Sequence, residues 1–192
     1  DWRHMDVICD GNFYCHLDLQ VIGRHNALNA LAAAGAAWML GIPGESVSRG
    51  LENFTGAERR MQFKGVFNGA DVYDDYAHHP DELAATIEAV RSMNYQRIVV
   101  AFQPHTYTRT HALFGDFVTQ LQKPDLVVLA EIYAARERNT VGISSADLAA
   151  KVPGSVFCET LPQVTEWLRE NVQPGDLVLT VGVPPQLRVG GS

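Results

Sequence analysis

Residues 97–110 have the sequence RIVVAFQPHTYTRT, in which an apolar run passes directly into polar residues. A short apolar run without polar alternation is typical of a strand that is covered on both faces, as in a parallel sheet. We therefore predict a buried strand at residues 97–102 and a helix from about residue 110 to residue 122. Ligands of such sheets bind beyond the carboxyl ends of the strands, so the polar residues after this strand are a candidate binding segment.

Strand and helix patterns alternate on both sides of this segment. Upstream, the pair Asn68-Gly69 predicts a hairpin, because it favours the backbone of a two-residue turn. Strands connected by crossover helices predict an α/β fold with a doubly wound, mainly parallel sheet. The predicted strands are residues 61–67, 70–74, 97–102, 125–130, 155–158 and 176–181, and the predicted helices are residues 80–93, 110–122, 144–151 and 161–171.

The first 56 residues have a different pattern. Alternation at residues 6–8 and 13–21 predicts two short strands around Asp10-Gly11-Asn12. Residues 25–40 are apolar nearly all round, which predicts a helix that is buried on most faces and ends at Gly41. A shorter helix is predicted at residues 45–54, and the pattern changes after residue 56, where we place a domain boundary.

Composition excludes several classes of protein. The 192 residues carry a net charge of -7 and no visible basic face, which argues against nucleic-acid binding. No apolar run reaches the roughly 18 residues of a membrane span, so we expect a cytoplasmic protein without membrane insertion. The three cysteines show no CxxC pair or zinc-type spacing and are expected to be reduced thiols. Neither GxGxxG nor GxxxxGK[ST] occurs, so ATP chemistry would need residues upstream of Asp1.

The segment DDYAHHP, residues 74–80, joins a predicted strand to a helix. A carboxylate there can accept both hydroxyls of a ribose, and two imidazoles can donate to an anion or exchange protons near neutral pH. The alternative is an Asp that caps the helix, with surface histidines and Pro80 in the first helical turn. A metal site at His78 and His79 is disfavoured, because adjacent histidines point in different directions and no further ligands occur at a helpful spacing.

A second candidate segment is QPHTYTRT, residues 103–110. Thr108 or Thr110 can cap the following helix while Arg109 projects near its positive end, and both features favour a carboxylate or phosphate. The alternative is an ordinary capped helix with a solvated arginine. A third polar cluster, EIYAARER at residues 131–138, also follows a predicted strand.

Two further polar pairs lie before residue 61. His25 and Asn26 open the apolar helix, where their side chains could bond a purine or complete the helix cap. Arg59 and Arg60 lie on the linker, where they could reach a phosphate or remain solvated.

Taken in order, five segments resemble the Mur ligase family over roughly residues 12–182: GRHNALNALAA, ERRMQF, DDYAHHP, QPHTYTRT and PGDLVLTVG. The family has an N-terminal domain for the UDP-sugar, a central ATPase domain with a P-loop and a C-terminal Rossmann-like domain. The resemblance implies that residues 1–56 are the tail of the central ATP-binding domain and that residues 57–192 are the C-terminal domain. The missing N-terminal and central domains are then expected partners of this chain.

The resemblance also implies an activity for the whole protein. The whole protein is expected to be an ATP-dependent, amide-forming ligase of peptidoglycan biosynthesis. Its expected reaction joins L-alanine to UDP-N-acetylmuramate through an acyl phosphate, and this chain alone is expected to be inactive. ATP and Mg2+ are implied, with the Mg2+ ligands mostly outside this chain. The implied residues are His25 and Asn26 for adenine, Asp75 for ribose, Arg60 for phosphate, Tyr76, His78 and Arg109 for alanine, and His78 and Arg60 for catalysis.

Three features depart from the family pattern. Some relatives have Gly where Ala77 stands and Arg where Thr106 stands, so one of two arginines for the amino-acid carboxylate is absent. The end of the chain, VGVPPQLRVGGS, lacks the usual glycine-rich close.

Two alternative functions are a ligase that adds a whole peptide to the same sugar nucleotide and a stand-alone nucleotide- or amino-acid-binding module. The QPHTYTRT run favours alanine over a peptide.

Overall fold

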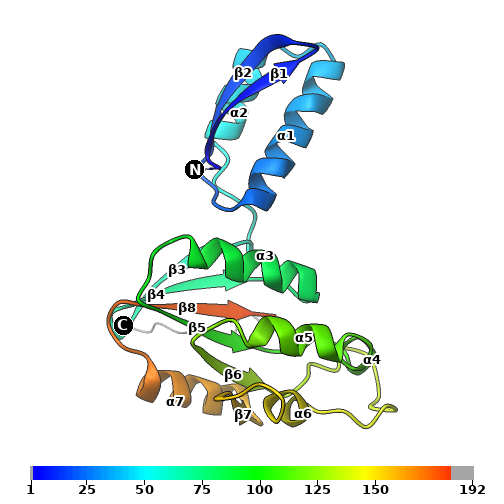
Figure 1. The fold of residues 1–192 in the computed structure, drawn as a ribbon, viewed down its shortest axis with the longest axis vertical. Helices are drawn as coiled ribbons and strands as arrows, with labels where there is room; N and C mark the ends of the chain where they lie inside the picture. The colour runs from blue at the N-terminus through cyan, green and yellow to red at the C-terminus, as the bar shows by residue number, and fades with distance from the viewer. Residues whose placement is uncertain (1, 183–192) are drawn as a thin grey trace. The chain divides into compact units, whose positions relative to one another are not determined.

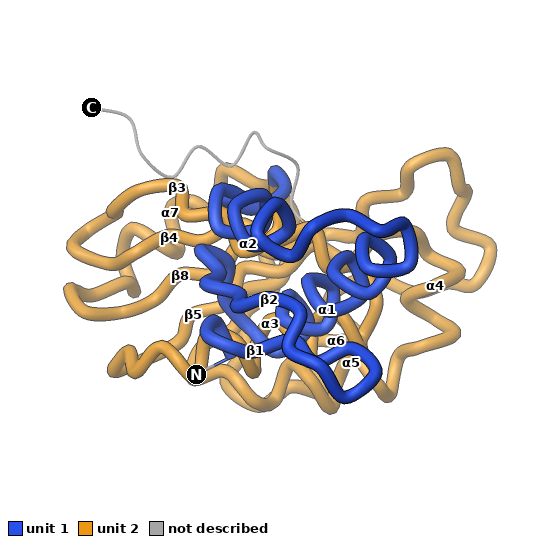
Figure 2. The backbone as a smooth tube through the Cα atoms, turned by 90° about the horizontal axis from the view of Figure 1, so that it is seen from above, with its two compact units in different colours: residues 1–58 blue, residues 59–192 orange. Residues whose placement is uncertain are grey.

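The computed structural model describes residues 2–182 and divides the chain into two compact units, residues 1–58 and residues from 59 onward (Figure 2). The atypical C-terminal segment noted above, residues 183–192, lies outside the described residues. None of the helices within residues 2–182 has the length and apolar character that crossing a membrane requires.

The first unit is a hairpin packed against two helices. Its hairpin consists of β1 (His4–Cys9) and β2 (Asn12–Asp18), joined through Asp10 and Gly11, whose φ angles of 49° and 76° form the predicted turn. The helices are α1 (Arg24–Met39) and α2 (Gly44–Glu52). The end of α1 is confirmed at Gly41, which adopts a φ of 72° and donates to the Trp38 carbonyl at 2.9 Å.

Only one side of the helix predicted at residues 25–40 is buried within this unit. The buried residues of α1 are Ala27, Ala30 and Ala34, whereas Leu28 and Trp38 are 51% and 40% exposed. Within residues 2–58, α1 packs against the hairpin and α2, which cover only its alanine side. Burial of its other faces would need neighbours outside these residues, so that part of the expectation stays a prediction.

The second unit is built on one six-stranded sheet with the order β3-β4-β8-β5-β6-β7 (Figure 1). The first two strands form the predicted antiparallel hairpin, and the remaining neighbours are parallel. The predicted α/β fold with a mainly parallel sheet is therefore confirmed. The strands are β3 (Gln62–Phe67), β4 (Ala70–Asp75), β5 (Arg97–Phe102), β6 (Leu126–Ala130), β7 (Val156–Cys158) and β8 (Asp176–Val181).

Helices cover both faces of this sheet. Val164 and Leu168 of one helix, α7, pack against Ala101 and its neighbours on one face. The next residue of β5, Phe102, points to the other face and meets Phe117 of α5 with ring centroids 5.5 Å apart. The helices are α3 (Pro80–Arg91), α4 (Tyr107–Ala112), α5 (Phe114–Leu121), α6 (Ser145–Ala149) and α7 (Leu161–Asn171).

The single helix predicted at residues 110–122 is wrong. The segment forms two helices, because Leu113 between them leaves helical geometry with φ -112° and ψ 22°. The first of them, α4, also begins earlier than predicted, at Tyr107.

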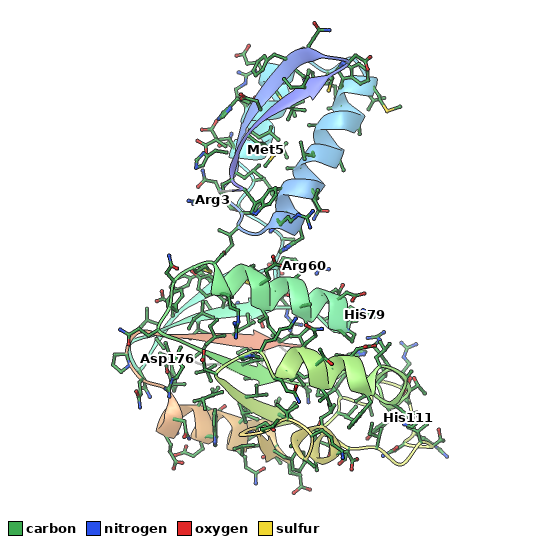
Figure 3. The ribbon with its side chains drawn as sticks, viewed as in Figure 1. Arg3, Met5, Arg60, His79, His111 and Asp176 are labelled. Carbon is green, nitrogen blue, oxygen red and sulfur yellow. The ribbon has the colours of Figure 1, made fainter. Side chains whose placement is uncertain are left out.

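Bonded pairs of polar side chains lie at the amino ends of the parallel strands. At the amino end, Arg97 holds Asp176 at 2.6 Å, and the Tyr95 hydroxyl donates to Asp71 at 2.5 Å. Figure 3 shows Asp176 at the opposite end of the sheet from His79 and His111. Since β8 lies between β4 and β5, the loops after β4 and β5 reach the carboxyl edge on either side of it.

Candidate functional site

Asp75, at the end of β4, is buried and engaged by backbone. One carboxylate oxygen accepts the Met61 N–H at 2.9 Å and the other accepts the Ala77 N–H at 2.8 Å. Only 2% of Asp75 is exposed. Its carboxylate therefore ties the linker to the start of the DDYAHHP loop.

Asp74, the residue before Asp75, bonds to Arg59 of the linker. It accepts from the Arg59 Nε at 2.9 Å and from the Thr180 hydroxyl at 2.8 Å. The Arg59 guanidinium lies 4.8 Å from the centroid of the Tyr76 ring, and the Arg59 carbonyl accepts the Tyr76 N–H at 2.7 Å. Arg59 thus holds Tyr76, which is 42% exposed, at the edge of the sheet.

The start of α3 is capped by His79. The His79 side chain accepts the Asp81 N–H at 3.3 Å, and Glu82 accepts the N–H groups of His78 and His79 at 3.0 and 3.3 Å. The alternative of a helix-capping Asp is therefore wrong, because both aspartates point back into the sheet and linker. Pro80 occupies the first helical turn, as predicted.

Glu82 is also the carboxylate nearest to Arg60. The guanidinium of Arg60 lies 4.0 Å from Glu82 and its side chain is 48% exposed. Burial raises the pKa of Glu82, but the N–H and the charge of His78, the N–H of His79 and the charge of Arg60 outweigh burial and lower it. The long contact leaves the Arg60 charge accessible to solvent.

The segment after β5 is joined to the loop after β6. The Thr106 N–H donates to the Tyr133 carbonyl at 2.9 Å, and the Tyr133 N–H donates to the Pro104 carbonyl at 2.9 Å. Thr106 precedes α4 with φ 70° and ψ 141°, a region that a β-branched residue rarely adopts. The bonds to Tyr133 hold this unfavourable backbone in place.

Neither Thr108 nor Thr110 caps α4, contrary to expectation. The N-cap residue is Thr106, whose side chain makes no capping bond. The Thr110 hydroxyl instead donates back to the Thr106 carbonyl at 2.7 Å. Thr108 bonds to Glu137 through both its N–H, at 3.0 Å, and its hydroxyl, at 2.5 Å. Glu137, from the loop after β6, therefore accepts the hydrogen bonds of the first turn of α4.

Four rings form a row along the carboxyl edge of the sheet. Tyr76 and His78 have centroids 5.3 Å apart, His78 and His105 are 6.2 Å apart, and His105 and Tyr133 are 5.3 Å apart. The row connects the loops after β4, β5 and β6. The structure thus brings the predicted Tyr76 and His78 together with His105, which the sequence did not single out.

Three buried atoms of the segment after β5 have no hydrogen-bond partner among the described residues: Gln103 Oε1, His105 Nδ1 and Arg109 Nη1. Burial lowers the pKa of His105, and the positive charges of Arg109 and His78 lower it further. Buried polar atoms in native proteins are normally bonded, so each such atom calls for a partner. The set offers a cationic donor beside neutral acceptors, which suits a small ligand with a carboxylate and an amine.

Gly182, directly after β8, fits between the two loops only because it lacks a side chain. A Cβ atom there would lie 2.3 Å from the Gln103 carbonyl oxygen, and its φ of 69° also favours glycine. Its N–H donates to the Asp75 carbonyl at 3.2 Å. The close approach sets the spacing between the loops after β4 and β5.

His25 and Asn26 lie in the first unit, apart in the chain from the other predicted site residues. Both are half-buried at the start of α1. The Asn26 amide donates to the Ile22 carbonyl at 2.8 Å, and the N-cap residue is Gly23. Contact of this pair with a purine and completion of the helix cap both stay predictions.

Three residues of this edge escaped the sequence reasoning: His105, Tyr133 and Glu137. His105 lies within QPHTYTRT, while Tyr133 and Glu137 lie within the polar cluster EIYAARER. The position of that cluster after a strand was the available signal, but only the three-dimensional structure pairs it with α4. Within residues 2–182, no group of three or more His, Cys, Asp or Glu side chains could hold a metal ion.

Comparison with known proteins gives a consistent result. A family model described as "Mur ligase, glutamate ligase domain" matches residues 59–183. A protein named UDP-N-acetylmuramate--L-alanine ligase from Agathobacter rectalis is 46% identical over 176 residues, 90% of this chain and 38% of that protein. A protein of the same name from Caldanaerobacter subterraneus is 38% identical over 206 residues, 99% of this chain and 45% of that protein. The chain thus spans less than half the length of these relatives.

Solved structures share the fold. The UDP-N-acetylmuramate-alanine ligase of Thermotoga maritima aligns with a TM-score of 0.74 and 31% identity over 94% of this chain and 39% of that one. A murein peptide ligase of Psychrobacter arcticus aligns with a TM-score of 0.66 and 20% identity over 94% of this chain and 39% of that one. The second likeness, at its lower identity, concerns the fold alone.

Proposed function

The chain belongs to the Mur ligase family, and we propose that it supplies the amino-acid site of an ATP-dependent ligase that joins L-alanine to UDP-N-acetylmuramate. The names of the relatives support this reaction, and the share of their length that the chain spans assigns the activity to a longer protein. In this proposal residues 1–56 are the tail of the central ATP-binding domain, and residues 57–192 are the C-terminal domain.

The observation that carries the proposal is the buried, unpartnered Nη1 of Arg109 beside His105. A guanidinium in that setting gains most from a carboxylate, because charge-assisted hydrogen bonds are strongest where water is excluded. Tyr76 and His78 complete the amino-acid site from the loop after β4.

His78 is the proposed residue beside the attacking amine. Its Nδ1 lies 3.0 Å from the Tyr76 carbonyl, which can only accept, so a neutral ring donates from Nδ1 and keeps Nε2 as a proton acceptor. Such a ring can take a proton from the alanine ammonium and leave a nucleophilic amine. The reaction then depends mainly on orienting that amine.

The nucleotide roles belong to residues of both units. His25 and Asn26 are proposed to contact adenine, Asp75 the ribose and Arg60 a phosphate. The accessible charge of Arg60 suits a phosphate, and the buried Asp75 requires the loop after β4 to open. ATP supplies the phosphoryl group that activates the sugar-nucleotide carboxylate. The Mg2+ ligands are proposed to lie mostly outside this chain.

Phosphate release from ATP tests the proposal. The 192-residue chain is compared with a longer polypeptide in which the upstream sequence of the gene precedes residue 1, each with Mg2+, UDP-N-acetylmuramate and L-alanine. We expect turnover in the longer protein alone, dependent on both the sugar nucleotide and alanine. Turnover by the short chain would contradict the need for an upstream P-loop.

Two other results would replace the proposal. Turnover with a tripeptide but not with alanine would identify a ligase that adds a whole peptide. Binding of nucleotide or alanine without turnover by either protein would identify a binding module.

A further inference from the structure

Helix α4 carries Arg109 but has no cap of its own. The first N–H groups of a helix have no partner within it, and a side chain of the N-cap residue commonly accepts one of them. Thr106 does not do so. Glu137, from the loop after β6, accepts the Thr108 N–H and hydroxyl instead.

The charge of Glu137 matches this position. The hydroxyl of Thr108 and its N–H lower the pKa of Glu137, burial acts against them, and the Tyr107 N–H and the charge of Arg109 lower it further. A carboxylate at a helix start is also favoured by the helix dipole. Glu137 is therefore ionised at neutral pH. The hydrogen bonds from Thr108 and the positive charge of Arg109 both stabilise its carboxylate.

The start of α4 needs such an anchor because its backbone is strained. Thr106 lies immediately before the helix at a φ of 70°, and conformations of this kind persist only when neighbouring contacts hold them. Tyr133 supplies one contact through its backbone and Glu137 supplies the other through its side chain. Both come from the loop after β6. Without them the first turn could relax and carry Arg109 away from His105.

We propose that Glu137 is a positioning residue that holds α4, and with it Arg109, in register with the amino-acid site. It acts through Thr108 and does not touch the reacting atoms. This inference rests on the proposed function, in which Arg109 binds the carboxylate of alanine. It predicts that loss of the Glu137 contact weakens amino-acid binding and leaves the nucleotide sites unchanged.

The test uses the longer, active protein with Glu137→Ala, Glu137→Gln, Thr108→Val and Thr108→Ser. We expect Glu137→Ala to raise the KM for alanine about tenfold or more, and the KM for ATP less than about twofold, because a small displacement of a positioning group costs much of its effect. Glu137→Gln keeps one acceptor oxygen and should raise the KM less. Thr108→Val loses the hydroxyl bond but keeps the N–H bond to Glu137, so it should raise the KM less than Glu137→Ala, whereas Thr108→Ser should keep the wild-type value.

A matched control is Glu166→Gln in α7, where Glu166 pairs with Arg169 on the surface. It should leave every kinetic constant unchanged. Equal changes in the KM values for alanine and ATP, or a wild-type KM for alanine in Glu137→Ala, would overturn the positioning role.

A second readout needs no substrate. The Thr108 amide should exchange with solvent faster in Glu137→Ala than in the wild-type chain, while amides within β5 keep their rates. If the wild-type protein did not ligate alanine, the proposed function would fail and this exchange would still decide whether Glu137 anchors α4. If it ligated alanine and the exchange rates were equal, the anchoring alone would fail.

Discussion

The loop after β4 and the segment after β5 meet at one edge of the sheet but use their polar groups in opposite ways. In the first, Asp74, Asp75, His79 and Glu82 bond to neighbouring backbone or side chains. In the second, Gln103, His105 and Arg109 each keep a buried atom without a partner among the described residues. The polar groups named in the first loop are bonded within the protein, whereas three atoms of the second segment have no protein partner in the described part of the chain.

This difference distinguishes groups that stabilise a loop from groups that are available to bind a ligand. Bonded carboxylates fix the course of a loop, so their loss is felt as reduced stability. A guanidinium nitrogen without a protein partner is available to donate to an anion, and such a charge-assisted bond adds affinity for that anion. Mutation of the bonded carboxylates of the first loop should therefore lower the free energy of unfolding, whereas mutation of Arg109 should lower the affinity for the amino acid.

The largest expected effect is that of Arg109→Ala. In the longer protein, kcat/KM for alanine should fall about 100-fold to 1000-fold, since truncating one partner of a buried charge pair costs roughly 2–5 kcal/mol. Arg109→Lys should not restore it, because an ammonium lacks the planar fork of a guanidinium. Steady-state kinetics with varied alanine measure the effect, and the exposed Arg138→Ala is the control. A normal kcat/KM in Arg109→Ala would mean that this arginine does not bind the amino acid, and the comparison between the two loops would fail.

Asp75→Asn should have the next largest effect, and on stability. Asparagine offers one oxygen to the two N–H groups that Asp75 accepts, so we expect a loss of about 2 kcal/mol in the free energy of unfolding. Thermal unfolding should show a fall in Tm of roughly 4–8 °C. Asp81→Asn, whose side chain is 94% exposed, should change Tm little. A large rise in the KM for ATP without a change in Tm would instead favour the ribose role.

Much of this edge could be predicted from the sequence. The strand at residues 97–102 and the turn at Asn68-Gly69 follow from local patterns, and the structure has both. The same reasoning found Tyr76, His78 and Arg109, because each follows a strand whose carboxyl end is a usual place for ligands. Local chemistry and position along the chain were sufficient for these residues.

The failures concern contacts between distant segments. Thr108 was expected to cap its own helix, but Glu137 reaches it from 29 residues away. The bond from the Met61 N–H to Asp75 also depends on how the linker folds back and could not be predicted from the sequence. No local pattern reports which of several polar partners is nearest after folding. His105 was missed for the same reason, since its burial depends on three loops.

The smallest expected effect, a pH dependence at His105, tests whether the unsatisfied segment is also destabilising. Burial, Arg109 and His78 lower the pKa of His105 below its ordinary value of about 6.5. Between the lowered and the ordinary pKa the unfolded chain binds more protons, so the contribution to stability is fully present above about pH 6.5 and is lost as the pH falls towards the lowered pKa. Urea unfolding of wild type and His105→Gln across this range should show that their free energies of unfolding converge at low pH.

A saturating carboxylate on Arg109 should cancel part of the arginine charge and raise the His105 pKa, so alanine binding to the longer protein should be accompanied by proton uptake. Calorimetry in buffers of different ionisation enthalpy measures that uptake, and its absence in His105→Gln would assign it to this ring.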